Sequence, residues 1–141
     1  YVDTDGSRQR PVMVHRAILG SVERFTGIMI EHYAGVFPAW LSPVQVRILP
    51  VAESHNEFAA ALANELESHN LRVEVDDSAE SVGKKIRIAE QSKVPAMLVV
   101  GDKEAAGEAL TVRRHGQKDQ LSLTKEEFIR SFLQEVKERK G

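Results

Sequence analysis

The most constraining feature of this chain is the apolar run Ala96-Met97-Leu98-Val99-Val100, which lies between a proline and a glycine. A short, continuous apolar run of this kind is typical of a strand whose two sheet faces are both covered. Similar strand patterns occur at residues 44–49, 71–75 and 109–114. The chain must therefore build layers on both sides of a central sheet.

Helix patterns separate these strands. Ser54 with Glu57, and Thr124 with Glu127, have the spacing of capping boxes, and Ser81 can begin a further helix. The resulting order, β-α-β-α-β-β-α, predicts an α/β sandwich. Its first three strands should be parallel, because right-handed crossovers join them.

The segment before residue 42 has a different character, with fewer charged residues. Residues 11–18 are rich in β-branched and apolar side chains, which predicts a strand. Ser21 can N-cap a helix that runs to about residue 33. The apolar stripe of that helix is so wide that we expect two of its sides to be buried. We therefore expect two units, residues 1–41 and residues 42–141.

Composition narrows the classes of function. Among 141 residues there is no cysteine, which excludes a disulfide scaffold and any thiolate metal site within this chain. Nineteen basic residues against 21 acidic ones give a net charge of −2, which argues against a nonspecific polyanion binder. No apolar run is long enough to span a membrane. The chain opens on Tyr1 rather than methionine, so we expect it to be cut from a longer protein.

Familiar catalytic motifs are absent. The five histidines do not form an HxxxH or HExxH spacing, and there is no GxGxxG, Walker or GxSxG sequence. His15 lies in the predicted strand, where it could be a satisfied buried imidazole or a functional group. Arg24 could form a surface ion pair or be aimed at a nucleotide. The remaining histidines are expected at the solvated surface: His32, His55, His69 and His115.

Three segments carry a resemblance to a known family. The segment from His15 to Phe25, HRAILGSVERF, resembles motif 3 of the class II aminoacyl-tRNA synthetases in its threonyl-tRNA synthetase form. The similarity continues through FPAWLSPVQV at 37–46 and VPAMLVVGDKE at 94–104, and so covers essentially the whole chain. It implies a three-layer α/β anticodon-binding domain with a mixed, mostly parallel sheet, after a strand-helix remnant of the antiparallel catalytic domain.

The resemblance also implies an activity. The full enzyme, a cytoplasmic homodimer in this family, would use ATP with Mg²⁺ to ligate threonine to threonine tRNA. The present segment would bind the anticodon and be inactive alone. Motif 3 places an ATP-contacting role on Arg24. His15 matches one ligand of a zinc ion whose other two ligands lie upstream. Glu104 and Arg113 match the positions that contact anticodon bases.

The resemblance is weaker at Asp77-Ser78-Ala79-Glu80, where the family commonly carries Arg-Asn-Glu. Ala79 occupies the position that usually offers an asparagine amide to the anticodon, so we expect looser or differently arranged anticodon recognition. Several basic residues could hold the RNA backbone or be plain solvated surface: Lys84, Lys85, Arg87, Arg114 and Lys118. The alternatives to a synthetase fragment are a stand-alone RNA-binding or protein-interaction module with this fold, and an oligomerisation appendage.

Overall fold

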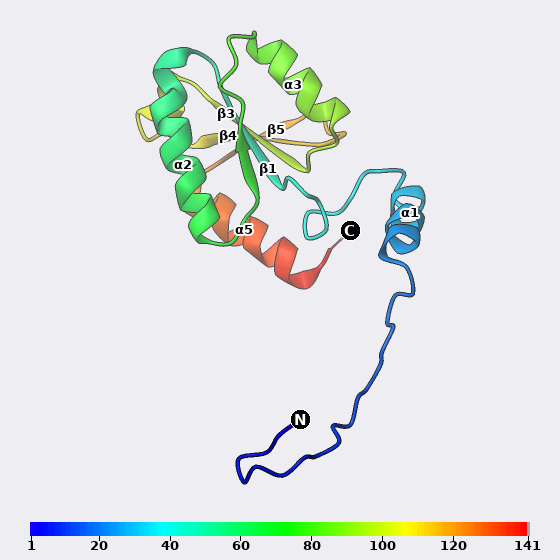
Figure 1. The fold of residues 1–141 in the computed structure, drawn as a ribbon. Helices are drawn as coiled ribbons and strands as arrows, with labels where there is room; N and C mark the ends of the chain where they lie inside the picture. The colour runs from blue at the N-terminus through cyan, green and yellow to red at the C-terminus, as the bar shows by residue number, and fades with distance from the viewer. Residues whose placement is uncertain (141) are drawn as a thin grey trace.

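Five strands form one sheet in the order β2-β1-β3-β4-β5 in the computed structural model, which describes residues 1–140 (Figure 1). The first three strands along the chain are parallel, and β4 and β5 pair antiparallel to their neighbours. The predicted parallel arrangement is thus confirmed. The strands are β1 (Val46–Pro50), β2 (Val73–Val75), β3 (Ala96–Val100), β4 (Leu110–Arg114) and β5 (Gln120–Leu123).

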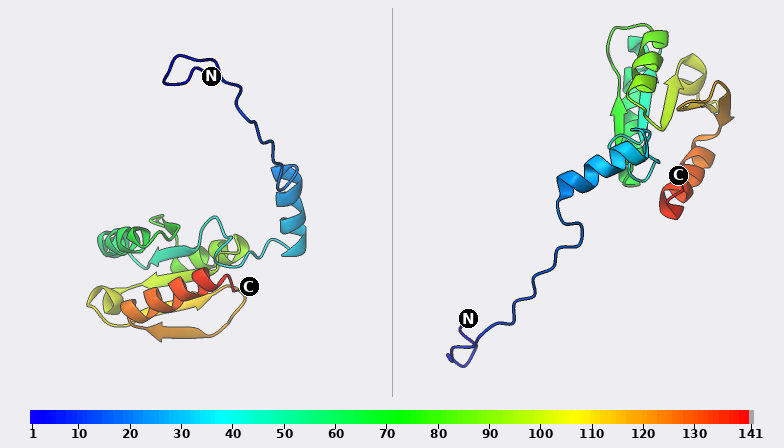
Figure 2. Two further views of the ribbon diagram at one scale, coloured as in Figure 1. Left: turned by 90° about the horizontal axis from the view of Figure 1, so that it is seen from below. Right: turned by 90° about the vertical axis from the view of Figure 1, so that its right-hand side faces the viewer.

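Helices cover both faces of this sheet (Figures 1 and 2). Leu66 of α2 and Phe132 of α5 pack on Ile48 and Leu98 in the larger core, whereas Ala89 of α3 packs on the opposite face. This is the expected three-layer α/β fold with a mixed, mostly parallel sheet. The helical elements are α1 (Val22–His32), η1 (Glu53–His55), α2 (Asn56–Ser68), α3 (Val82–Gln91), α4 (Asp102–Ala105) and α5 (Lys125–Glu138).

The predicted helix starts are only partly correct. Thr124 and Glu127 cap α5 reciprocally, because each side chain accepts a hydrogen bond from the other residue's backbone N–H, at 3.3 and 3.0 Å. The proposed cap at Ser54 is wrong, because the chain first makes the short helix η1 and α2 begins at Asn56. Three short elements were not predicted, η1, α4 and β5, since none is long enough to show a period.

The N-terminal segment lies apart from the sheet in every view (Figures 1 and 2). Ser21 caps α1 as predicted, since its hydroxyl accepts a hydrogen bond from the backbone N–H of Arg24 at 3.3 Å. The predicted strand at 11–18 is wrong for this structure, because a strand needs a hydrogen-bonded neighbour and none of residues 1–140 lies beside it. The expected burial of α1 is also wrong, because none of its residues is buried.

The connection between α1 and the sheet is fastened by polar side chains. Gln45 is fully buried, and its amide donates to the carbonyl of Ala39 at 2.8 Å and accepts from the backbone N–H of Arg72 at 2.9 Å. The Arg72 guanidinium in turn donates to the carbonyls of Ser42 and Trp40. Residues 39–45 are therefore part of the folded body. Among residues 1–140, no helix is both long and apolar enough to cross a membrane.

Candidate nucleic-acid interface

The two faces of β4 have different surroundings because side chains alternate along a strand. Leu110 and Val112 point into the core beneath α2 and α5. Thr111 and Arg113 point to the other face, where they pair across the sheet with Ser122 and Gln120 of β5. Thr111 and Arg113 are half-buried and their two partners are exposed, so no helix covers this part of the sheet. We call these four residues the open face.

Glu104 is fixed at the edge of the open face. Its carboxylate accepts a hydrogen bond from the Thr111 hydroxyl at 2.7 Å and another from the backbone N–H of Gly101 at 2.9 Å. Partial burial raises the pKa of Glu104, but these hydrogen bonds and the nearby Lys103 outweigh it and hold the pKa below its ordinary value. Glu104 therefore presents an ionised carboxylate in a set orientation.

Arg113 lies two positions along β4 from Thr111, on the same face. Its Nε is buried and has no hydrogen-bond partner among residues 1–140. A buried donor without a partner is uncommon in folded proteins and costs about 1–3 kcal/mol. The structure thus places Glu104 and Arg113 at the same part of the sheet, Glu104 bonded to Thr111 and Arg113 two positions along β4 on the same face as Thr111.

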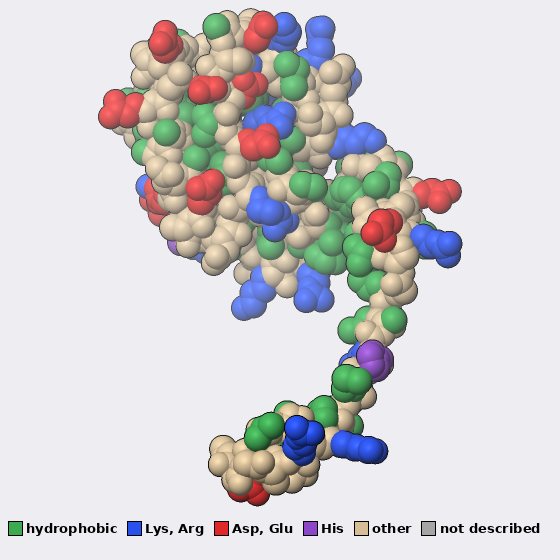
Figure 3. All heavy atoms as spheres, viewed as in Figure 1, with side chains coloured by type: hydrophobic (Ala, Val, Ile, Leu, Met, Phe, Trp, Pro, Cys, Tyr) green, Lys and Arg blue, Asp and Glu red, His purple; other side chains and the backbone are tan. Residues whose placement is uncertain are grey.

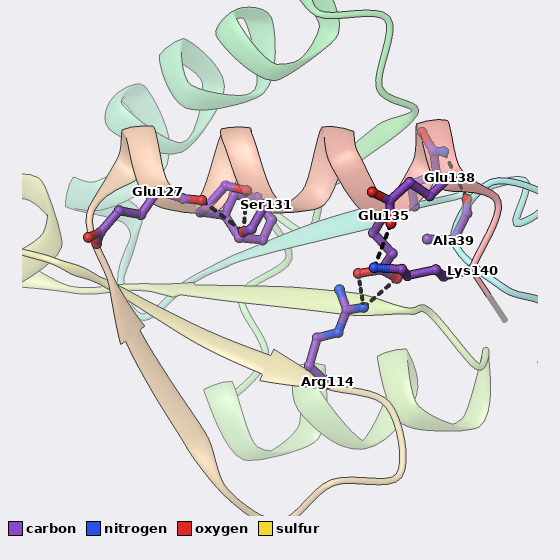
Figure 4. A network of polar contacts seen from close by, with 9 residues as sticks. Ala39, Arg114, Glu127, Ser131, Glu135, Glu138 and Lys140 are labelled. Carbon is purple, nitrogen blue, oxygen red and sulfur yellow. Dashed lines mark hydrogen bonds and ion pairs between the residues drawn. The ribbon is translucent and has the colours of Figure 1, made fainter.

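Arg114, the next residue, points to the opposite face. Its guanidinium pairs with the Glu135 carboxylate on α5 (Figure 4). It also lies 5.3 Å from the centre of the Phe132 ring. Arg114 is therefore not plain solvated surface, and its contact with the RNA backbone stays a prediction. Lys85 is buried and so is not plain solvated surface, and its contact with RNA stays a prediction, whereas Lys84, Arg87 and Lys118 are exposed. Contact between those three residues and RNA stays a prediction.

His55 was predicted at the solvated surface, but only 6% of it is exposed. Its Nδ1 accepts a hydrogen bond from the backbone N–H of Ala52 at 3.2 Å, so its Nε2 carries the proton and donates to Asp102 at 2.9 Å. The imidazole thereby joins the loop after β1 to α4, the helix that carries Glu104. One feature of the sequence could have revealed this role. His55 and Asp102 each follow a strand, and the ends of adjacent parallel strands lie close together.

The other histidines differ among themselves. His32 and His69 are exposed as predicted, whereas His115 is half-buried with its Nδ1 2.9 Å from the Glu90 carboxylate. His15 is exposed on the extended segment, so a buried imidazole is not what the structure shows. Within residues 1–140 there is no group of three or more His, Cys, Asp or Glu side chains that could hold a metal ion.

Arg24 is exposed on α1, and the structure does not bring Arg24 or His15 to the open face. Exposed apolar side chains lie on α1 and on the extended segment before it (Figure 3). Exposed apolar groups there include Val12, Val14 and Phe25. Exposed apolar side chains in this number are typical of a surface that packs against another part of a protein.

A three-layer α/β domain whose open sheet face carries arginine, carboxylate and amide groups has the features of an RNA-binding module. Comparison with known proteins gives the family. Residues 45–135 match the family described as "Anticodon binding domain", and the chain belongs to this family.

Individual relatives extend the similarity beyond that domain. The chain is 47% identical over 99% of its length to the threonine–tRNA ligase of Carboxydothermus hydrogenoformans, and 48% identical over 100% of its length to that of Clostridioides difficile. It spans 22% of each of these relatives, or about a fifth of their length. The RNA binding domain of threonyl-tRNA synthetase from Cryptosporidium parvum has a similar crystal structure. Its TM-score is 0.75 at 39% identity, with 84% of this chain and 30% of that chain covered.

Proposed function

We propose that this chain is the C-terminal part of a threonine–tRNA ligase and that its open face binds the anticodon of threonine tRNA. The observation that carries the proposal is the juxtaposition of Glu104 and Arg113 around Thr111. A fixed carboxylate accepts hydrogen bonds from a base amino group, and an arginine donates to base carbonyls or phosphate. Unpaired bases of a loop can reach such groups, whereas paired bases cannot.

Residues 1–41 would then end the catalytic domain, with residues 42–141 as the anticodon-binding domain. Two observations support this division. The similarity to threonine–tRNA ligases runs through the first 41 residues as well as the sheet domain. The exposed apolar side chains of residues 12–30 have the chemistry of a surface that packs against the rest of a larger domain.

The complete ligase would join threonine to its tRNA with ATP and Mg²⁺, in the cytoplasm and as a homodimer. Arg24 would contact ATP, a role that suits an exposed, permanently charged, planar guanidinium. His15 would be one zinc ligand, because its imidazole is exposed and an imidazole nitrogen is a common ligand of zinc. The remaining ligands and ATP-site residues would come from outside this chain, so the chain alone would not catalyse.

Anticodon recognition would be arranged differently near Ala79. Ala79 is exposed beside Ser78 and has no polar group to offer a base. Loss of one base-specific hydrogen-bond pair costs about 1–3 kcal/mol of discrimination.

The alternative function is a stand-alone binding module. It does not explain why the similarity to threonine–tRNA ligases extends through the first 41 residues.

The proposal is tested by RNA binding to the 141-residue chain. Fluorescence anisotropy with a threonine anticodon stem-loop should show binding that weakens about tenfold in Arg113→Ala, because one base or phosphate contact is lost. Arg130→Ala removes an exposed arginine from α5, on the far side of the sheet, and should bind as the wild type does. Equal losses in both variants would show that only general charge matters and would contradict the proposal.

A further inference from the structure

His55 is a buried polar side chain that the proposed function has not used. It ends η1, between β1 and α2, and only 6% of it is exposed. Its Nδ1 accepts a hydrogen bond from the backbone N–H of Ala52 at 3.2 Å, and its Nε2 donates to the Asp102 carboxylate at 2.9 Å. A buried imidazole whose two nitrogens both have partners is held in one orientation. His55 is therefore a fixed donor directed at the first residue of α4.

The short helix α4 depends on contacts of this kind. It has only four residues, Asp102–Ala105, and a single turn of helix is not stable by itself. The Asp102 side chain is exposed, so without the donor of His55 it would be free to turn into solvent. Glu104 lies on the same turn and reaches the open face, where it accepts from the Thr111 hydroxyl. His55 thereby ties the helix that carries Glu104 to a segment 47 residues earlier in the chain.

Two separate contacts thus hold the loop after β3. Thr111 holds the Glu104 side chain from the sheet, and His55 holds the start of α4 from the loop after β1. A side chain that meets a base in one orientation binds more tightly when it is already ordered, because ordering a loop during binding costs affinity. The contact with His55 therefore bears on RNA binding as well as on the fold.

We propose that His55 is a positioning residue for anticodon recognition: through Asp102 it fixes α4 and so holds the Glu104 carboxylate ready for a base amino group. The inference rests on the proposed anticodon function and deepens it. The sign of the effect at Asp102 separates positioning from simple electrostatics. Asp102 is an exposed carboxylate, so on charge alone its removal should strengthen binding to a polyanion. Positioning predicts that its removal weakens binding.

The experiment measures the affinity of protein variants for the threonine anticodon stem-loop by fluorescence anisotropy. Asp102→Ala and His55→Asn should each weaken binding about fivefold, because Glu104 must then be ordered as the RNA binds. In His55→Asn the shorter side chain keeps an oxygen for the Ala52 N–H but does not reach Asp102. Asp102→Asn keeps an acceptor oxygen for His55 and should retain most of the affinity.

Two further measurements show whether the effect passes through Glu104. In a Glu104→Gln background, Asp102→Ala should cost less than about twofold more, because the contact that it positions is already weakened. The matched control is Glu108→Ala, which removes an exposed carboxylate from the loop after α4. It should bind as tightly as the wild type or more tightly.

The failures are distinguishable. If the wild type does not bind the stem-loop, the proposed function fails and the inference fails with it. If the wild type binds and Asp102→Ala binds equally well or more tightly, the inference is wrong while the proposed function stands. The same conclusion follows if Asp102→Ala loses as much in the Glu104→Gln background as in the wild type, or if Asp102→Asn loses as much as Asp102→Ala. Circular dichroism checks the fold of each variant. Where His55→Asn is not folded, Asp102→Ala decides, because the Asp102 side chain is exposed.

Discussion

Replacement of Glu104 with glutamine separates the charge of this side chain from its shape. The carboxylate accepts from the Thr111 hydroxyl and from the Gly101 N–H. Glutamine can keep both contacts, with its oxygen toward the Gly101 N–H and its amide toward the Thr111 hydroxyl, which can turn to accept. The fold should therefore persist, and the change should remove only the negative charge.

The cost follows from the two hydrogen bonds. Hydrogen bonds to charged groups contribute about 1.5–3 kcal/mol each, and neutral ones about 0.5–1.5 kcal/mol. Two such differences give about 2 kcal/mol, which we reduce to about 1 kcal/mol because Glu104 is only half-buried and partly screened by solvent. Glu104→Gln should therefore lower the free energy of unfolding by about 1 kcal/mol at pH 7. It should also weaken binding to the anticodon stem-loop about tenfold, because the amide no longer attracts a base amino group as an anion does.

The effect on stability depends on pH. The pKa of Glu104 is lowered in the folded protein, where partial burial raises it but the hydrogen bonds from Thr111 and Gly101 outweigh burial. Its contribution is present above the unfolded pKa of about 4.3 and is lost as the pH falls through the lower folded value. The stability difference between the wild type and Glu104→Gln should therefore shrink as the pH falls below about 5.

Urea unfolding at several pH values measures this difference. Glu108→Gln is the matched control, since Glu108 is exposed on the loop that follows α4 and should show neither effect. A Glu104→Gln variant with wild-type stability at pH 7 and an unchanged pH profile would refute the reasoning about the carboxylate.

Three further predictions concern the fold and the complete ligase. Gln45→Leu should lower the free energy of unfolding by about 2–5 kcal/mol in urea titrations, because the buried carbonyl of Ala39 and N–H of Arg72 lose their partners; a loss under 1 kcal/mol (about the size of one hydrogen bond) would contradict this. Thr124→Ala should cost about 1 kcal/mol in the same titrations through loss of the α5 cap, and an unchanged midpoint would show that the cap does not matter. In the complete ligase, His15→Ala should lower zinc content by elemental analysis, and full zinc occupancy would exclude His15 as a ligand.

Sequence patterns predicted the elements that rest on periodicity. The apolar run at β3 correctly predicted helices on both faces of the sheet. The alternation of strands and helices correctly predicted that β1, β2 and β3 are parallel. β5 was not predicted, because it has only four residues and only two of them are apolar. The strand expected at 11–18 has the composition of a strand but no neighbour to pair with, and pairing is not encoded in composition.

The site was predictable only in part. Glu104 and Arg113 were named from a family resemblance, and alternation along β4 then explains why they share a face. Their contact with RNA stays a prediction. The burial of His55 and Lys85 could not be predicted, because each is held by groups from separate loops: Lys85 by the carbonyls of Pro50 and Asp76, and His55 by Ala52 and Asp102. Such pairings depend on how loops meet in space.

The most direct test of the central claim is to map where the anticodon stem-loop binds. Backbone amide chemical shifts of the 141-residue chain, recorded during titration with the RNA, should change most at Glu104, Thr111, Arg113 and β5, and little along α5. Changes confined to α2 and α5, with the open face unaffected, would contradict the proposal that this face binds the anticodon.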